Sequence, residues 1–478
     1  MNVVKAIFLY GENNPISMVS EGKQLKKNAV GFLELIFQSI SFTAPAIAVT
    51  ATMTGAAAFA YGALPLTYIL ALFAVLSAGF VIYVFSRKVA SSGGYYRYIE
   101  RGLGNRGGAF GGWVYLLYTV IGATPFIYFE TALATQVGFG VLGIALPSWS
   151  WYPIGIVVAM AAFGLAFSGI KNSLRYSVYT GTIEMVILLV AAFFILSHTS
   201  HPFNAAVFTT KFSPTGWKGV ALGLVFSFTS LAGWGSMTFL GSEARAAHFN
   251  IRRGVVVTII VLGAFFLFMS YVMTVGWGPS NMSTYFSNFL PGLILTLKDG
   301  GIVLAAVMFI FLVNSGFVDT LAIINAGSRD LYTMSKDGML PSSLSNTHKK
   351  HKSPHIALIY NTIIGIVIFT ITGWAFGPFN GFLVTGIWTG AGTIIDHIIL
   401  NTSLPFYFRK LKDLRWTYVV IPVIATIIYL FALYGSFLSV NIYVLIAVVF
   451  MVIYLLFGAI YFGVKKGIKV VLEEGEEV

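Results

Sequence analysis

Stretches of about 20 apolar residues recur along almost the whole chain, and they constrain its fold more than any other feature. A helix needs a run of about this length to cross the hydrocarbon core of a bilayer. Charged residues make up only 10% of the 478 residues, against roughly 25% in a soluble domain. The sequence therefore predicts an all-α polytopic membrane protein with twelve transmembrane helices, at about residues 29–52, 64–86, 109–137, 152–170, 174–197, 217–241, 254–276, 300–325, 355–374, 381–408, 416–436 and 441–463.

The positive charges fall almost entirely on one side of these twelve spans. If the N-terminus is cytoplasmic, every Lys and Arg except Lys211, Lys218 and Lys298 is cytoplasmic too. Cytoplasmic loops of membrane proteins carry this excess of positive charge. The net charge of +12 thus reflects orientation and indicates neither a nucleic-acid partner nor an obligate protein partner. We expect a multi-pass protein of the plasma membrane with both termini in the cytoplasm.

Two of the spans are interrupted near their middle. The first contains Pro45, and the sixth contains Gly233 and Gly235. Proline removes a backbone donor, and paired glycines lower helix propensity. Interrupted spans at matching places in two halves point to a substrate site at the membrane midplane of a secondary transporter. The alternative is that each break is only a packing kink, since Gly and Pro are frequent in transmembrane helices.

The positions of the breaks also predict how the chain is organised. Five spans separate the start of one broken helix from the start of the other, so two five-helix repeats of opposite orientation are expected. The predicted segments are a cytoplasmic arm (1–28), repeat 1 (29–197), repeat 2 (217–408), two peripheral helices (416–463) and an acidic cytoplasmic tail (464–478).

Three spaced motifs resemble the amino acid–polyamine–organocation (APC) superfamily. The segment from Asn325 to Pro341, with Arg329, Tyr332 and Asp337, is similar to the inner loop after span eight of these permeases. The segments 92–113 and 243–253 are similar to two further family motifs, although Ala246, Ala247 and Arg252 stand where the family has Asn, Pro and Pro. The resemblance covers about residues 29–410 and implies a LeuT-like fold with broken helices 1 and 6.

The resemblance also implies where a substrate binds. In the family, backbone amides of the first break take the substrate carboxylate, and carbonyls of the second break take its amine. This chain has Pro45-Ala46-Ile47 where the family has Gly-x-Gly. The family often places an aromatic residue after the glycine of span six as a gate over the substrate. The implied substrate-binding residues are Thr43, Ala44, Pro45, Ala46, Ile47, Ser230, Leu231, Ala232, Gly233 and Trp234. The expected gate residues are Trp234 in span six and Trp388 deep within span ten, and the alternative for both is core packing.

Acidic residues inside the spans form a second group of candidates, because an ionisable residue within a membrane is a functional hypothesis by default. Counted along span five, Glu184 falls where proton-coupled relatives carry a lysine in place of a sodium ion. Asp319 and Thr320 lie close to where sodium-coupled relatives supply hydroxyl ligands. We expect these three residues to hold a coupling H⁺ or Na⁺, and the alternative is that the acids are structural. Glu130 is expected near the outer vestibule.

The leading functional hypothesis is secondary active transport of an amino acid by alternating access, coupled to H⁺ or Na⁺ and without a cofactor or bound metal. The alternative within transport is an uncoupled amino acid exchanger. A membrane enzyme is disfavoured, because the chain has no cysteine and no His-Glu-x-x-His or Gly-x-Ser-x-Gly motif. Because no acidic residue lies near Ser230–Trp234 in the sequence, cationic amino acids and polyamines are disfavoured as substrates.

Overall fold

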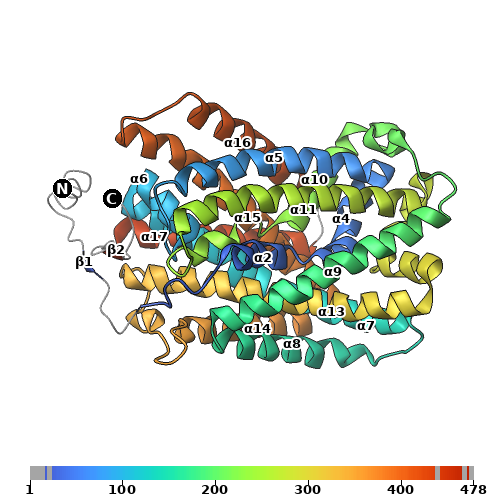
Figure 1. Cartoon of the computed structure of the whole chain (residues 1–478), viewed down its shortest axis with the longest axis horizontal. Coiled ribbons are helices and arrows are strands. Elements are labelled where there is room, and N and C mark those ends of the chain that lie inside the picture. The colour runs from blue at the N-terminus through green and yellow to red at the C-terminus, as the bar shows by residue number, and fades with distance from the viewer. Residues whose placement is uncertain (1–16, 19–23, 437–441, 466–470, 473–478) are drawn as a thin grey trace.

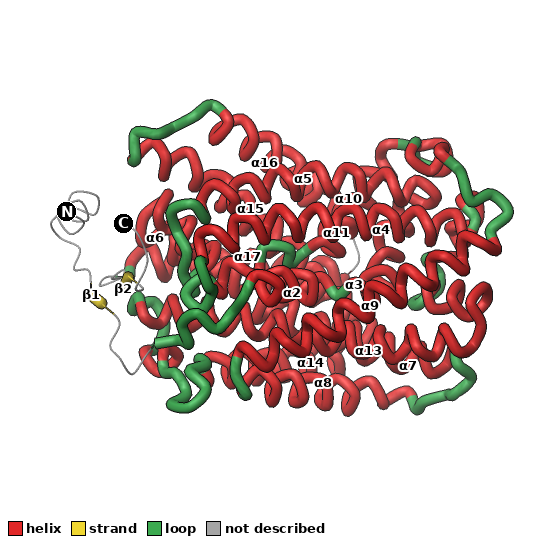
Figure 2. Tube along the Cα trace, viewed as in Figure 1, coloured by secondary structure: helices red, strands yellow, loops and turns green. Residues whose placement is uncertain are grey.

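The computed structural model describes residues 17–18, 24–436, 442–465 and 471–472, and it is a bundle of long helices that run in one general direction (Figure 1). Figure 2 shows that helices make up most of the described chain. The strands within this part are the parallel pair β1 (Ser17–Met18) and β2 (Val471–Leu472), beside the two termini. The predicted all-α class is confirmed. Residues 1–16 of the predicted arm and residues 473–478 of the predicted tail lie outside the described residues.

The helices of the described chain overlap every predicted span, and several of them extend beyond it, as α13 (Pro291–Lys336) extends beyond span 300–325. Predicted span 64–86, in contrast, is the helix Leu64–Phe85. The bounds are α2 (Phe32–Thr43), α3 (Pro45–Ile47), α4 (Met53–Ala60), α5 (Leu64–Phe85), α6 (Gly94–Leu116), α7 (Thr124–Val141), α8 (Trp151–Phe167), α9 (Ile170–His198), α10 (Trp217–Leu231), α11 (Ala247–Trp277), α12 (Met282–Tyr285), α13 (Pro291–Lys336), α14 (His355–Phe376), α15 (Pro378–Lys410), α16 (Thr417–Ser436) and α17 (Ile442–Val464).

Eleven helical stretches of the described chain are long and apolar enough to cross a membrane. The first, Phe32–Phe85, has 54 residues, which as one helix would be more than twice as long as the hydrocarbon core is thick. It is not one helix, because Tyr61 has a non-helical backbone between α4 and α5, with φ 53° and ψ −132°. The predicted count of twelve spans and the inverted repeat stay predictions.

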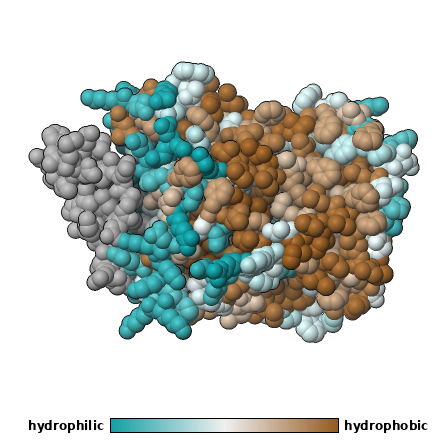
Figure 3. Space-filling view, viewed as in Figure 1, coloured by the Kyte–Doolittle hydropathy of each residue, from teal (hydrophilic) through white to brown (hydrophobic). Residues whose placement is uncertain are grey.

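A broad hydrophobic band crosses the molecule, as expected for a surface that faces lipid. Figure 3 shows this band between two ends where hydrophilic residues gather, and the end beside β1 and β2 carries more of them. Helix α17 (Ile442–Val464) also exposes apolar side chains, including Val449, Ile453 and Ile460, all about half exposed or more. Exposed apolar side chains in such number along one helix are expected where a protein faces lipid.

The polar motif at the end of α13 is helical, although the resemblance predicts a loop there. Residues 325–336 continue α13, so the prediction is wrong for this part of the motif. The polar side chains are tolerated in a buried helix because they are paired: Arg329 with Glu243, and Asp337, just beyond the helix, with Arg97 and Tyr96.

The two broken spans lie next to each other within the bundle. Helix α2 packs against α9, α11 and α13, and α10 packs against α4, α5 and α16. At the breaks, Phe42 lies so close to Gly233 that a Cβ atom on this glycine would overlap the phenyl ring. The backbone of Gly233 also has a φ of 94°, which glycine adopts at little cost. This glycine thus permits the close approach of the two breaks.

Candidate functional site

The first break is a single residue in the left-handed region. Ala44 has φ 42° and ψ 70°, and it separates α2 from the short helix α3, which begins at Pro45. The helix cannot continue through this point, because proline lacks the N–H donor and disfavours helical backbone in the residue before it. A π-helical turn, Ala48–Thr52, follows α3 and leads into α4. The predicted interruption of the first span is therefore confirmed.

The backbone amides at the start of α3 are occupied by other parts of the protein. The Ala46 N–H donates to Oε1 of Glu184 over 2.6 Å, and the Ile47 N–H donates to the hydroxyl oxygen of Ser315 over 3.4 Å. The Ala48 N–H donates to the carbonyl of Ala44, and Pro45 has no N–H. A helix N-terminus favours anions, and here the carboxyl group of Glu184 occupies that position. The expectation that these amides take a substrate carboxylate stays a prediction.

Glu184 joins three elements at this break. Its Oε1 accepts from Ala46 of α3 and from the Ser315 hydroxyl of α13, the latter over 2.7 Å, while Glu184 itself lies on α9. The side chain is 1% exposed, and Oε2 has no hydrogen-bond partner among the described residues. Asp319 lies on the same helix as Ser315 and is within electrostatic range of Glu184. The neighbouring Thr320 donates its hydroxyl hydrogen to the carbonyl of Gly316.

The second break opens the end of α10. Ala232 leaves the helix with a ψ of 145°, and Gly233 follows with its positive φ. The chain resumes as a 3₁₀-helix at Ser236–Leu240. The last carbonyls of a helix carry partial negative charge, so the end of α10 favours a cation. Close to it, the Ser230 hydroxyl accepts from the Tyr68 hydroxyl over 2.8 Å and donates to the Phe226 carbonyl over 3.1 Å.

Between the two breaks lies a small hollow, which we name the acidic cavity. Its volume is about 30 Å³, and two carboxylates, Glu130 of α7 and Asp319 of α13, line it. The remaining lining includes the predicted site residues Thr43, Ala44, Ile47, Ser230 and Ala232. A hollow of this size holds about one water molecule or one ammonium group. Six of the predicted site residues, Asp319 among them, thus line the same cavity.

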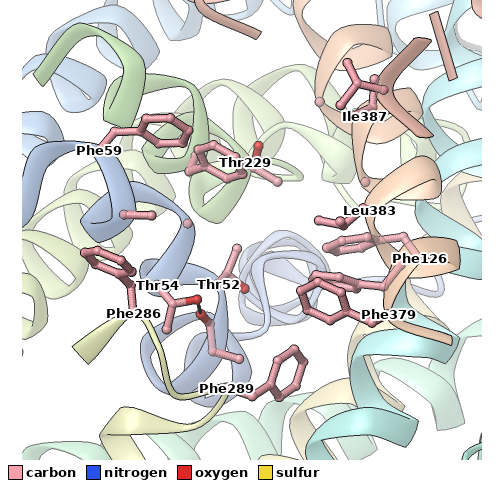
Figure 4. Close-up of a pocket in the computed structure, with 18 of the residues that line it drawn as sticks. Thr52, Thr54, Phe59, Phe126, Thr229, Phe286, Phe289, Phe379, Leu383 and Ile387 are labelled. Atoms are coloured by element: carbon pink, nitrogen blue, oxygen red, sulfur yellow. Dashed lines mark hydrogen bonds between the residues drawn. The ribbon is translucent and has the colours of Figure 1, made fainter. Parts of the chain in front are cut away.

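A larger hollow, which we name the aromatic cavity, adjoins the acidic cavity. Its volume is about 500 Å³, and Thr52, Phe126 and Thr229 line both cavities. Figure 4 shows Phe59 and Phe286 on one side of it, Phe126 and Phe379 on the opposite side, and Thr52 between them. No charged residue is among its lining residues in the described chain. A volume of this order is typical of small-molecule sites.

The other predicted site residues do not line either cavity. Trp234 lies in a separate small hollow with Val75 and Tyr429, its ring centroid 5.5 Å from that of His397. Trp388 faces α17, where its indole N–H donates to the Ala447 carbonyl over 2.9 Å and its ring lies 4.5 Å from Phe450. The remaining predicted residues outside both linings are Pro45, Ala46, Leu231, Gly233, Glu184 and Thr320.

Sequence reasoning missed the proximity of acids to the second break. Asp319 and Glu130 share the acidic cavity with Ser230 and Ala232, so the argument against cationic substrates is wrong for the folded chain. It considered neighbours along the chain only, whereas Asp319 and Glu130 come from distant helices. The Thr52 hydroxyl, which donates to Oε1 of Glu130 over 2.7 Å, was missed as well.

On the side of the breaks where α2 begins, hydrogen bonds between distant segments close the structure. The N–H groups of Ala29 and Val30 donate to the Glu243 carbonyl over 2.9 and 3.1 Å, and the Arg245 N–H donates to the Val30 carbonyl. These bonds hold the segment before the first broken span against the segment after the second. The ion pair of Glu243 with Arg329 adds α13 to the same junction. The acidic cavity lies between the breaks, and the aromatic cavity lies on their other side, along α4 and α10.

Comparisons with known proteins agree with a membrane carrier. Residues 34–470 match the profile of the family described as amino acid permease. The chain is 23% identical to the branched-chain amino acid permease BcaP of Bacillus subtilis, over 87% of this chain and 89% of that protein. It is 26% identical to BcaP of Lactococcus lactis, over 81% and 85%. It is also 24% identical to the low-affinity putrescine importer PlaP of Escherichia coli, over 62% and 65%.

Proposed function

Because the chain belongs to the amino acid permease family, we propose that it is a secondary active transporter that carries an amino acid or a related amine across the plasma membrane by alternating access. The distribution of Lys and Arg supports cytoplasmic termini. The family is one of permeases, which favours transport over a membrane enzyme. The relatives' names include both an amino acid and a diamine as substrates, so the proposal at this level covers both classes.

The observation that carries the proposed coupling is the bond from the Ala46 amide to Glu184. This carboxyl group lies at the start of helix α3 and contacts α13 through Ser315. Its Oε2 is buried and without a partner among the described residues. A proton that binds Oε2 changes the charge at the break without removing either hydrogen bond at Oε1. Such a change in charge alters the electrostatic energy of the α3 N-terminus, which favours an anion.

We propose H⁺ rather than Na⁺ as the coupling ion. The partners of Oε1 are an N–H and an O–H group, both of which donate. A metal cation needs several coordinating oxygen atoms, and the described chain contains no group of three or more His, Asp or Glu residues that could hold one. A proton needs only the free oxygen.

Uptake into liposomes tests this proposal. The purified protein is reconstituted, and labelled leucine and isoamylamine (an amino acid and its decarboxylated amine) are offered with an inward proton gradient, with an inward Na⁺ gradient, or with neither. We expect accumulation of at least one solute with the proton gradient, and its collapse with an uncoupler. Accumulation driven only by Na⁺ would contradict proton coupling, and uptake insensitive to both gradients would indicate exchange.

Glu184→Gln tests the residue itself. Glutamine keeps an oxygen acceptor for the Ala46 amide but exchanges no proton, so accumulation should fall at least tenfold while exchange of labelled against unlabelled solute continues. Glu34→Gln is the matched control, since Glu34 lies half-buried in the first turn of α2. If Glu184→Gln accumulates solute as the unchanged protein does, the role proposed for Glu184 is wrong.

A further inference from the structure

Asp319 is an acidic residue with no positively charged partner among the described residues that line the two cavities. Its side chain is 8% exposed and lines the acidic cavity, and Oδ1 has no hydrogen-bond partner among the described residues. No Lys or Arg lines either cavity in the described chain. A buried carboxylate within a membrane protein is costly without a partner. The charged groups that act on Asp319 electrostatically are the acids Glu130 and Glu184, so a cation is the group that this position lacks.

The groups that would receive a carboxylate are, in contrast, already in use. The amides at the start of α3 donate to Glu184, Ser315 and the Ala44 carbonyl. Hydroxyl groups in the lining donate to protein oxygens as well: Thr43 to the Ile40 carbonyl, Thr52 to Glu130, Thr389 to the Thr385 carbonyl and Ser230 to the Phe226 carbonyl. A substrate carboxylate in the acidic cavity would meet two acids and no cation.

The two cavities differ in size, so the small one suits the charged end of a substrate and the large one suits an apolar body. The acidic cavity, at about 30 Å³, has room for an ammonium group and little more. The aromatic cavity, at about 500 Å³, has seven phenylalanines in its lining and no charged side chain. An apolar or aromatic body packs well against such rings. A second ammonium group in this cavity would find no acidic partner, which disfavours a diamine.

We propose that the substrate is a monoamine without a carboxylate group, with its ammonium beside Asp319 and Glu130 and its apolar body in the aromatic cavity. This inference rests on the proposed transport function, and it assigns Asp319 to the substrate, whereas the sequence suggested the coupling ion. Phenethylamine and isoamylamine are suitable probes, because each is the decarboxylated form of an amino acid of the same body. The two members of a pair differ only in the carboxylate.

The test measures binding and uptake separately. Thermal unfolding of the full-length protein is followed with phenethylamine, phenylalanine, isoamylamine, leucine and putrescine, since a ligand that binds the folded state raises the midpoint. We expect the two monoamines to raise the midpoint and the two amino acids to leave it unchanged. Stabilisation by the amino acids alone, by putrescine alone, or by none of the five would overturn the inference.

The readouts also distinguish this inference from the proposed function. Leucine uptake without isoamylamine binding overturns the inference and leaves transport intact. Isoamylamine binding with no uptake of any solute supports the inference and overturns transport. Asp319→Asn should weaken binding of the monoamines about tenfold or more, the usual effect of removing a charged hydrogen-bond partner. Glu130→Gln should weaken it in the same direction, so the test does not depend on one variant that folds.

A matched control for both variants is Asp413→Asn. Asp413 is exposed and paired with the exposed Arg415, and neither residue lines either cavity. This change should leave monoamine binding as it is. If Asp319→Asn and Glu130→Gln both fold and bind phenethylamine as tightly as the Asp413 variant does, the ammonium group does not lie in the acidic cavity and the inference is wrong.

Discussion

Glu243, in the segment that follows the second break, forms an ion pair with Arg329 of α13, and both side chains are only 1% exposed. The backbone carbonyl of the same Glu243 accepts hydrogen bonds from Ala29 and Val30, just before α2. One residue therefore joins three segments on the closed side of the site. In alternating access, this junction is the part that must separate before a substrate leaves on that side.

Glu243→Gln should weaken this junction. Loss of one partner leaves the Arg329 charge buried and unpaired, which costs about 3–5 kcal/mol, so a conformation that hydrates Arg329 becomes more populated. The chain has no cysteine, and Ser39→Cys introduces a single thiol where α2 contacts Ser236. We expect a maleimide to label this thiol several-fold faster in the Glu243→Gln background. The same rate in both backgrounds, with unchanged thermal midpoints, would contradict the role of Glu243.

The sequence predicts the helices and both breaks well, because these follow from local properties. Apolar runs determine where α5 begins and ends, and Pro45 determines where α2 stops. Six of the predicted site residues line the acidic cavity between the breaks, and their role in binding a substrate stays a prediction. The sequence does not reveal the direction in which each side chain points. Trp388 and Thr389 are adjacent in the sequence, yet only Thr389 reaches the cavity.

Long-range contacts explain the remaining differences. Glu130 and Asp319 lie almost 190 positions apart in the sequence, and only the packing of α7 against α13 brings both to the end of α10. The Ala46 amide meets Glu184 for the same reason, because α3 packs against α9. No pattern along one chain reveals that an amide at a helix start is already occupied. The aromatic lining likewise comes from separate helices and loops.

Gly233→Ala should disrupt the contact between the breaks. The methyl group would overlap the Phe42 ring, and the φ of 94° is strained for alanine. Together these effects should cost about 2–4 kcal/mol, measured as a lower thermal midpoint with a loss of uptake. Gly140→Ala is the control, because a Cβ atom there meets nothing within 4 Å. Equal midpoints for the two variants would show that the breaks do not need a glycine at this position.

The two buried tryptophans should respond differently to replacement by phenylalanine. Trp388→Phe removes the hydrogen bond to the Ala447 carbonyl, which should lower stability by about 1 kcal/mol or more and leave the KM for uptake unchanged. Trp234 follows the second break directly and packs beside His397, so Trp234→Phe should raise KM several-fold. Thermal unfolding and uptake kinetics measure both effects. A raised KM for Trp388→Phe would instead support the gate predicted from the sequence.

Phe382→Ala should weaken binding of a monoamine with a large apolar body and leave binding of a short monoamine unchanged. The Phe382 ring stacks on Phe126 with centroids 4.8 Å apart, and both rings line the aromatic cavity. Phenethylamine would lose an aromatic contact worth about 0.5–1.5 kcal/mol beyond buried area, so its affinity should fall about tenfold once that area is included. Ethylamine has only two carbon atoms and should bind as before, because Phe382 does not line the acidic cavity. Phe203→Ala, at a side chain that is 95% exposed, is the control. If ethylamine and phenethylamine lose affinity equally, Phe382 acts on the protein's conformation and the apolar body of the substrate does not occupy the aromatic cavity.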